Sequence, residues 1–433
     1  MDDSALCVAI IGAGLSGLAL ALALHQQGIN TSVYEARDAP LDIGGGLMLT
    51  PNGLKVLEKL GIYQFLNTQG YNFDRIYFQD GDSGRILETI EYGGLKRHGI
   101  RALRTYRRTV LKELLAKTHE EGIPIHFGRK FTQIVSETDD NVTWEFADGT
   151  TETASLLIGA DGIHSTVRRY LAPGVEPTFG SMAAIVAAIP TAQLELPKAD
   201  LDDLNNASNA NPLPGGIVVP KVGAFVIAPQ TFSGDEVMIT VQRAMSEATH
   251  GHWTDLDADK EALKALFRQN ADRFPPMVQN AVRDTPHANL KIWPFYHIPR
   301  LNRWTSAQAP GGCGRVAILG DSAHALPPSA GQGVNQAFED AYTFALVLGR
   351  LILNSSIQKP TNDQLQKTLY SWQLFRQARV DRVLDLNRQM DLRRMPGAPD
   401  KDITAMDSAF DWPFKIDFDA GVTECMESAD VTL

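Results

Sequence analysis

The sequence predicts an α/β fold, a three-layer Rossmann-like domain that is interrupted by an inserted antiparallel sheet and followed by a C-terminal helix. Three observations support this fold class. A glycine-rich turn joins an apolar strand to a helix at Gly12, and two later apolar strands end at Asp161-Gly162 and at Gly320-Asp321. Between residues 180 and 291 the pattern changes to alternating apolar strands. Parallel strands with crossover helices are therefore expected on both sides of an antiparallel insertion.

Length, charge and cysteine content place the chain in a broad class. With 433 residues, 44% of them hydrophobic, it should form two domains, or one domain with a sizeable insertion. A formal net charge of −11 without a basic block argues against a nucleic-acid partner. Cys7, Cys313 and Cys425 are too few and too scattered for a disulfide framework or a zinc site. We therefore expect no metal and a reducing, cytoplasmic location.

The apolar run from Ala5 to Leu24 is long enough to suggest a membrane span or a signal peptide. Asp2 and Asp3, however, put negative charge where a signal peptide needs positive charge. Glycines also break the run at the spacing of a strand-to-helix turn. We therefore expect no membrane span.

The same run predicts a nucleotide-binding βαβ unit. Residues 6–11 form a short apolar strand, and residues 15–27 form a helix rich in Ala and Leu that ends at Gly28. A second strand at residues 31–35 completes the unit. The pyrophosphate of a dinucleotide is expected at the helix N-terminus, where free N–H groups and the helix dipole favour negative charge.

The glycines of this turn have separate roles. Gly12 permits the tight turn, Gly14 lets a pyrophosphate approach the backbone, and Gly17 lets the helix pack closely on the strand. Glu35 stands about twenty residues further on, where an acid binds ribose hydroxyls and would repel the 2′-phosphate of NADP. The alternative is a glycine turn that merely packs a strand on a helix, and the βαβ context with Glu35 argues against it.

The other two segments supply more of the same site. A strand at residues 153–160 ends at Asp161-Gly162, which alone could be a plain turn. A strand at residues 315–319 is followed by Asp321, at the end of the sheet where ligands collect. Pro327-Pro328 then keeps the backbone extended.

A glycine-containing loop follows the two prolines and leads into a long helix. Gly331 and Gly333 allow a flat ligand to approach, and residues 334–351 form a helix whose N-terminus faces that ligand. A positive helix end suits a flavin ring, which gains negative charge when it is reduced. Together, the three segments indicate a site for FAD.

These segments are similar to the signatures of the class A flavoprotein monooxygenases, the group of salicylate and para-hydroxybenzoate hydroxylases. The resemblance covers about residue 6 to about residue 385. Residues 44–53 resemble the family's glycine-rich loop and Pro-Asn helix start beside the flavin. Arg108 is similar to the arginine that contacts FAD, and Arg107 is the alternative at nearly the same spacing.

The resemblance implies one FAD per chain, with NADH or NADPH and O2 as co-substrates. One oxygen atom would then be inserted into a small molecule by hydroxylation or epoxidation, through a flavin C4a-hydroperoxide. We assign no catalytic residue, because His324 is expected to shape its loop rather than to act as a base. The predicted cofactor-binding residues are Gly12, Gly14, Leu15, Ser16, Gly17, Glu35, Ala36, Arg37, Gly45, Gly46, Arg108, Asp161, Asp321, Pro328, Gly331, Gly333, Val334 and Asn335.

The resemblance also divides the chain. The FAD-binding Rossmann-like domain is predicted at 1–75, 100–178 and 285–395, the substrate-binding sheet domain at 76–99 and 179–284, and an acidic tail at 396–433. A charged amphipathic helix at residues 364–392 should pack on the FAD-binding domain. The tail is expected to be mobile, unless Trp412-Pro413-Phe414 docks it locally.

The substrate side departs from the family pattern. Residues 184–188 are apolar where many members carry an arginine, and Met48 offers no base for ionising a phenol. We therefore expect an apolar aromatic or alkenyl molecule, of a polyketide or alkaloid kind, rather than a salicylate-like acid. The predicted pocket residues are Met48, Ile217, Val219, Phe225, Trp293, Tyr296 and Pro327.

Two other functions stay open at this level. A flavin oxidase or dehydrogenase of the same fold would never insert oxygen. A non-catalytic FAD-fold protein would bind a partner, as some prenylation escort proteins do, but it would not need Gly331 and Gly333. Flavin-dependent halogenation is disfavoured, because the chain has no Trp-x-Trp-x-Ile-Pro segment. Both a monomer and a homodimer are compatible with the sequence.

Overall fold

A five-stranded parallel sheet forms one end of the molecule, in a computed structural model that describes residues 6–431 except 41–44, 207, 249, 309–311, 355–359 and 395–410. Its strand order is β18-β12-β1-β2-β8, so β1 lies in the centre with β2 and β12 on either side. The strands are β1 (Cys7–Ile11), β2 (Asn30–Tyr34), β8 (Ile125–His126), β12 (Leu156–Gly159) and β18 (Val316–Ile318). This order confirms the predicted Rossmann-like arrangement.

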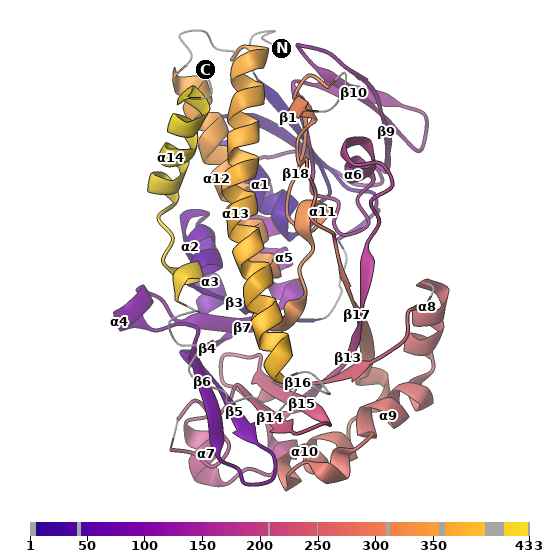
Figure 1. Cartoon of the computed structure of the whole chain (residues 1–433), viewed down its shortest axis with the longest axis vertical. Coiled ribbons are helices and arrows are strands. Elements are labelled where there is room, and N and C mark those ends of the chain that lie inside the picture. The colour runs from indigo at the N-terminus through magenta and orange to yellow at the C-terminus, as the bar shows by residue number, and fades with distance from the viewer. Residues whose placement is uncertain are drawn as a thin grey trace.

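The parallel sheet is the middle of three layers (Figure 1). Helices α1 (Leu15–Gln26), α5 (Arg107–Glu120) and α12 (Gly333–Asn354) cover one face. Helix α6 (Thr166–Leu171) and the three-stranded meander β9 (Phe131–Glu137), β10 (Val142–Phe146) and β11 (Thr151–Ala154) cover the other. The single strand predicted at residues 153–160 is wrong. It is two strands, β11 and β12, which belong to different sheets.

The second part is a seven-stranded sheet with the order β17-β13-β16-β15-β14-β5-β6. Its strands are β5 (Arg75–Asp80), β6 (Ile86–Glu91), β13 (Thr178–Pro190), β14 (Gly215–Val219), β15 (Gly223–Pro229), β16 (Glu236–Ala244) and β17 (Lys291–His297). The predicted antiparallel sheet is confirmed except at one strand pair, because β5 and β14 run parallel. Strand β17 pairs with β13 although it lies beyond the predicted boundary at residue 284.

Helices cover only one face of this seven-stranded sheet. They are α7 (Lys198–Asp202), α8 (His250–Ala258), α9 (Lys260–Arg268) and α10 (Pro276–Arg283), and α8 to α10 pack their apolar sides on the sheet. Alternate residues of β13, β15 and β16 enter that core, including Ile185, Ile227 and Ile239. The intervening residues of these strands point the opposite way, toward the parallel-sheet domain.

A small sheet lies between the two parts. It consists of β3 (Gly46–Leu49), β7 (Ala102–Tyr106) and β4 (Tyr71–Phe73), in the order β3-β7-β4. Leu49 and Leu103 enter the main core, together with helix α2 (Pro51–Lys59). Two short helices, α3 (Tyr63–Asn67) and α4 (Leu95–His98), connect the surrounding segments. One face of the small sheet is thus left directed at the seven-stranded sheet.

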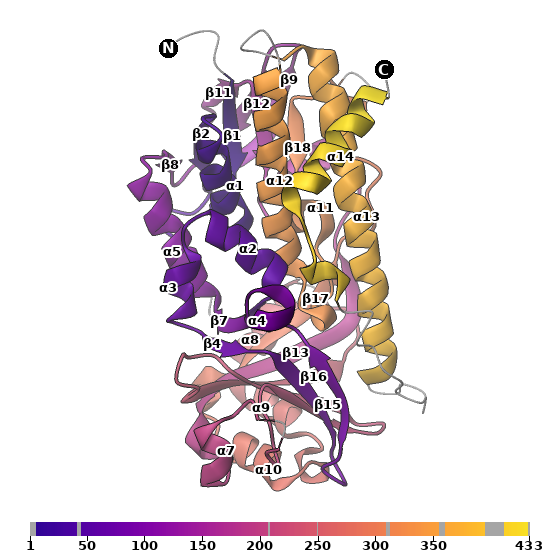
Figure 2. The same ribbon diagram turned by 90° about the vertical axis from the view of Figure 1, so that its left-hand side faces the viewer.

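The C-terminal region consists mainly of two helices that pack on the rest of the molecule. Helix α13 (Asn362–Arg394) confirms the helix predicted at residues 364–392 and runs along the length of the molecule (Figure 1). Helix α14 (Phe418–Val431) lies beside α12 and α13 (Figure 2), and its Val422 is buried. The expectation of a mobile tail is wrong for this helix, whereas the acidic residues Asp400, Asp402 and Asp407 lie outside the described residues. Phe414 is buried, as the docking prediction required.

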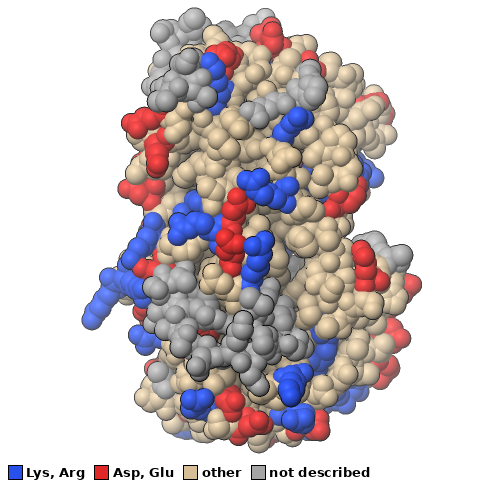
Figure 3. Space-filling view, in the orientation of Figure 1, with Lys and Arg blue, Asp and Glu red and all other residues tan. Residues whose placement is uncertain are grey.

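The surface carries charges of both signs. Acidic and basic side chains are interspersed on the face shown in Figure 3. Exposed ion pairs of the chain include Arg300 with Asp381 and Arg388 with Asp385. Within the part of the chain that the structure describes, no helix has both the length and the apolar character needed to cross a membrane.

Candidate functional site

The three segments singled out in the sequence meet at the carboxyl end of β1. A Cβ placed on Gly17 would lie 2.0 Å from Gly12 O, and one on Gly12 would lie 2.5 Å from Ala160 O. A Cβ on Gly320, which has a φ of +58°, would lie 3.3 Å from Ser16 Oγ. The β1–α1 turn therefore packs directly on the ends of β12 and β18, which only residues without side chains allow.

The N-terminus of α1 is open to a ligand. Gly14 is its N-cap and supplies no side-chain cap, and nothing lies within 4 Å of a Cβ built on it. Leu18 N donates to Gly14 O at 3.0 Å and closes the first turn, so the N–H groups of Leu15, Ser16 and Gly17 have no partner within the helix. Free donors and open space are what an anionic pyrophosphate requires.

Glu35 is buried at the end of β2 and holds the turn in place. Its Oε2 accepts from Ala13 N at 3.0 Å, and its Oε1 accepts from Arg37 N at 3.0 Å. The next residue, Ala36, is exposed. These contacts put the carboxylate beside a cavity, as predicted for the acid that binds a ribose. The cavity is lined by Ala13, Gly14, Glu35, Arg37, Pro40, Arg107, Leu111, Leu115 and Phe127.

Arg107, and not Arg108, lines this cavity. Burial lowers the pKa of Arg107, while the nearby Asp321 carboxylate acts in the opposite direction. The guanidinium of Arg108 lies instead over the ring of Tyr106, 5.1 Å from its centroid. The structure thus favours the alternative residue of the pair, because the side chain of the first residue of α5 points to the cavity.

Asp161 joins the second segment to the third. Its Oδ2 accepts from Thr166 N at 2.7 Å at the start of α6, and its Oδ1 accepts from Ser322 Oγ at 3.1 Å. Ser322 lies on the short helix α11 (Asp321–His324), and its hydroxyl also accepts from Gly162 N at 2.9 Å. The adjacent Asp321 lies near enough to Arg107 to affect its pKa. Asp161 is already engaged by the protein.

The N-terminus of α12 forms the second open helix end. Gly333 begins the helix, and nothing lies within 4 Å of a Cβ built on it. Gly331 has a φ of +63°, and a Cβ there would overlap the Met48 side chain. Pro328 begins a 3₁₀ turn that Pro327 precedes, and Val334 is partly buried against the main core. The loop that was predicted to face the flavin is therefore unobstructed at Gly333.

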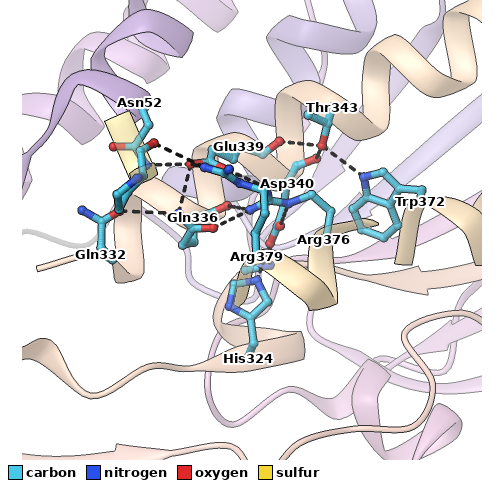
Figure 4. A network of polar contacts seen from close by, with 12 residues as sticks. Asn52, His324, Gln332, Gln336, Glu339, Asp340, Thr343, Trp372, Arg376 and Arg379 are labelled. Carbon is cyan, nitrogen blue, oxygen red and sulfur yellow. Dashed lines mark hydrogen bonds and ion pairs between the residues drawn. The ribbon is translucent and has the colours of Figure 1, made fainter. Parts of the chain in front are cut away.

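A buried polar network fixes this loop from behind (Figure 4). Arg376 on α13 donates from Nε to Asp340 Oδ1 at 2.7 Å and from Nη1 to Glu339 Oε2 at 2.5 Å. Asp340 Oδ2 in turn accepts from Gly320 N at 2.9 Å. Asn52 Nδ2 donates to Glu339 Oε1 at 2.6 Å. Helices α2, α12 and α13 are tied together just behind the flavin-facing loop.

His324 belongs to this network rather than to the cavity. Its Nε2 lies 2.5 Å from Asp340 Oδ2, and its ring contacts the tilted ring of Trp304, with 5.0 Å between the centroids. The side chain is buried. These contacts support the expectation that His324 shapes the loop and does not act as a base.

The predicted pocket residues divide between the two faces of the seven-stranded sheet. Four of them, Ile217, Val219, Phe225 and Tyr296, lie in or against the core under the helices, and placing them in the pocket is wrong. Phe225 packs against Phe267 with tilted rings, and the Tyr296 hydroxyl accepts from Trp253 Nε1 at 3.0 Å. Alternation along each strand decides the face, and the sequence pattern did not say which face the helices cover.

Met48 and Trp293 lie on the open face. Met48 contacts Gly331, and a Cβ on Gly45 would lie 3.8 Å from the Trp293 ring. Gly45 O also accepts from Arg107 N at 2.8 Å, which ties this loop to the cofactor cavity. The same region holds Met238 and Gln230 beside Gly46, together with Arg104. Arg104, Gln230 and Met238 were not predicted as site residues from the sequence. The position of Arg104 opposite Met48 in alternating strands could have indicated that both side chains lie on the same face of the small sheet.

The residues that line the cavity and the two open helix ends fit FAD. They combine unpaired N–H donors, room above two glycines, and the cations Arg37 and Arg107 with the acid Glu35. Over residues 5–356 the chain matches the family described as FAD binding domain. The 6-hydroxynicotinate 3-monooxygenase of Bordetella bronchiseptica is 29% identical over 344 residues, 77% of this chain and 80% of that protein.

A second relative and two solved structures are also similar to this chain. The 3-amino-4-hydroxybenzoate 2-monooxygenase PtnB3 of Streptomyces platensis is 30% identical over 354 residues, 79% of each chain. The structure of CtdE in complex with FAD and a substrate has a TM-score of 0.77 at 20% identity, over 99% of each chain. A salicylate hydroxylase substrate complex has a TM-score of 0.76 at 21% identity, over 98% of each chain. Both structures share this fold.

Proposed function

The chain belongs to the FAD binding domain family, and on that premise we propose that it is an NAD(P)H-dependent flavoprotein monooxygenase acting on a small aromatic molecule. The observation that carries this proposal is the meeting of two open helix N-termini, those of α1 and α12, beside Gly320. The N-terminus of α1 suits a pyrophosphate, and the N-terminus of α12 suits a flavin ring that becomes anionic. The relatives that match most of the chain are named as aromatic monooxygenases, which supports the same reaction class.

FAD, when bound, accepts a hydride from NAD(P)H and activates O2 for transfer to the substrate. The chain supplies binding and orientation. The N–H groups of Leu15 to Gly17 and the Arg107 guanidinium would hold the pyrophosphate, and Glu35 would hold the ribose. The N-terminus of α12, at Gly333, would stabilise negative charge on the ring.

Exclusion of water is the other task of the chain. The open faces of the small sheet and of the seven-stranded sheet approach each other at Gly46, whose Cβ position is 2.9 Å from Met238 Sδ. Apolar side chains such as Met48, Met238 and Trp293 line this region. A dry, closed space favours transfer of oxygen to the substrate over release of hydrogen peroxide.

The proposal is tested with the purified protein in its flavin-bound form. Oxidation of NADH and of NADPH is followed together with O2 uptake, hydrogen peroxide and oxygenated product, across a panel of aromatic compounds. A compound that accelerates oxidation and yields product without matching peroxide supports a monooxygenase. Oxidation that appears wholly as peroxide with every compound would indicate an oxidase and contradict the proposal.

A further inference from the structure

Arg104 lies on the face of the small sheet that is directed at the substrate side. It is paired with Met48 across the antiparallel strands β3 and β7. Its neighbour Leu103 points the other way, into the main core with Leu49. Residues opposite each other in a strand pair share a face, so Arg104 and Met48 point together. Met48 reaches Gly331, which places Arg104 near the flavin-facing loop.

The guanidinium stands where the two sheets meet. A Cβ on Gly46 would lie 2.9 Å from Arg104 Nη2 and 2.7 Å from Gln230 Oε1. Gln230 follows strand β15 and belongs to the seven-stranded sheet domain. Only a glycine at position 46 leaves room for both polar groups. The Arg104 side chain thus lies between the parallel-sheet domain and the seven-stranded sheet that covers it.

Arg104 has no counter-ion among the described residues. No side-chain hydrogen bond or ion pair joins it to them, its Nε is buried without a partner, and Gln230 Oε1 is buried and unpaired as well. The nearby Glu236 carboxylate accepts instead from the Tyr106 hydroxyl. Burial lowers the pKa of Arg104 to about 10, so the side chain remains a cation at neutral pH.

Every buried arginine of the described chain donates at least one side-chain hydrogen bond, although Nε of Arg168 and two guanidinium nitrogens of Arg315 have no partner. Arg376 binds Glu339 and Asp340, and Arg168 donates to Ser322 O at 3.1 Å and to Ile163 O at 2.7 Å. A cation that is partly withdrawn from solvent without a partner is costly, so its presence calls for a ligand of opposite charge. A guanidinium matches a carboxylate, which it can bind through two parallel hydrogen bonds.

We propose that Arg104 binds a carboxylate of the substrate, and that the chain therefore acts on aromatic acids. This inference rests on the proposed function, because it places the acid beside the flavin loop. It revises the apolar substrate that was expected from Met48 and residues 184–188. The cation is contributed by β7, a strand of the small sheet, and not by the β13 segment where the family pattern would place it.

The test is ligand binding to the flavin-bound protein, monitored by the change in flavin absorbance. The probes are hydroxybenzoates and hydroxypyridinecarboxylates, each paired with its primary amide. At least one acid should bind the wild type roughly tenfold or more tightly than its amide. Arg104→Met should weaken binding of that acid by roughly 30-fold or more and change binding of the amide little.

Arg101→Met is the matched control. Arg101 is a half-exposed cation directly before β7 that pairs with Asp74 at 2.9 Å, so its loss should leave the acid preference unchanged. If Arg104→Met fails to retain flavin, Arg104→Lys answers the same question. Lysine keeps the charge but loses the planar fork, so the preference for the acid should fall without vanishing.

Each outcome separates this inference from the proposed function. Equal binding of acids and amides to the wild type would overturn the inference, as would an acid preference that survives in Arg104→Met. Efficient oxygenation of neutral compounds alone would overturn it while leaving the monooxygenase proposal intact. Tight, Arg104-dependent binding of acids that never leads to oxygenated product would contradict the proposed function and leave the anion site standing.

Discussion

The side-chain amide of Asn335 donates from Nδ2 to Met48 O at 3.0 Å and so joins the first turn of α12 to strand β3. The same nitrogen donates to Gly331 O at 2.8 Å, and Asn335 Oδ1 accepts from Thr50 N at 3.0 Å. One buried side chain therefore sets the spacing between the flavin-facing loop and the strand that borders the substrate. Cofactor position and pocket shape are coupled through it.

Substitution of Gly14 and of Gly17 in the β1–α1 turn should affect different properties, FAD affinity in one case and stability in the other. Gly14→Ala has room for its Cβ within the protein but places it where the pyrophosphate must approach, so FAD affinity should fall roughly tenfold or more. Gly17→Ala sets a Cβ 2.0 Å from Gly12 O, so the apoprotein should lose about 1–3 kcal/mol of stability. FAD titration and urea unfolding of both apoproteins check this pair. Equal unfolding midpoints would refute the assignment of roles.

Arg107→Met should weaken FAD binding roughly 10- to 100-fold, because it removes a charge-assisted bond to the pyrophosphate. Arg108→Met is the control, since Arg108 lies over Tyr106 outside the cavity lining, and it should change affinity less than about threefold. Reconstitution of the apoproteins with FAD measures both. A larger effect at Arg108 would restore the residue first favoured from its spacing.

Asp340→Asn should destabilise the protein by about 3–5 kcal/mol, because it leaves Arg376 and His324 facing a buried neutral group. Asp381→Asn removes an exposed partner of Arg300 and should cost less than about 1 kcal/mol. Denaturant unfolding at pH 7 compares the two variants. Similar losses would show that the network contributes little.

The pH for that comparison follows from the pKa of Asp340. Burial alone would raise the pKa of this carboxyl, but the charges of His324 and Arg376 and their hydrogen bonds lower it below the usual value. A carboxyl with a lowered pKa contributes stability at pH values above its unfolded pKa, and loses it as the pH falls through the folded value. At pH 7 the full contribution of Asp340 is therefore present.

Phe414→Ala should cost about 3–5 kcal/mol, because the ring is fully buried near Tyr92 and Leu386. Phe232→Ala, the same change at a side chain that is 63% exposed, should have little effect. Thermal unfolding of the flavin-bound proteins measures both. If the two variants unfold at the same temperature, the C-terminal segment does not stabilise the molecule.

Local patterns were sufficient to predict the turn between β1 and α1. The arrangement of this βαβ unit can be predicted from the sequence spacing of Gly12, Gly14, Gly17 and Glu35. The turn, the helix start and the strand end follow one another within one βαβ unit. The acidic tail shows the opposite case. Its composition suggested mobility, but the apolar residues of Phe418–Val431 find a surface on α12 and α13 that composition does not reveal.

The choice between Arg107 and Arg108 shows where prediction from sequence spacing reaches its limit. Both residues begin the same helix, and their positions differ by about 100° of rotation around the helix axis. Spacing alone could not settle which guanidinium faces the cavity. Packing of Leu111 and Leu115 against the cavity decided it.

The sequence by itself determined the family and the cofactor, because these depend on contiguous motifs that carry their own turn and helix-end chemistry. Only the tertiary structure decided which face of the seven-stranded sheet is open and which arginine is left without a partner. Strand alternation divides residues into two faces but does not say which face receives helices. An unpaired Arg104 can be recognised only after every neighbour from distant strands has been placed.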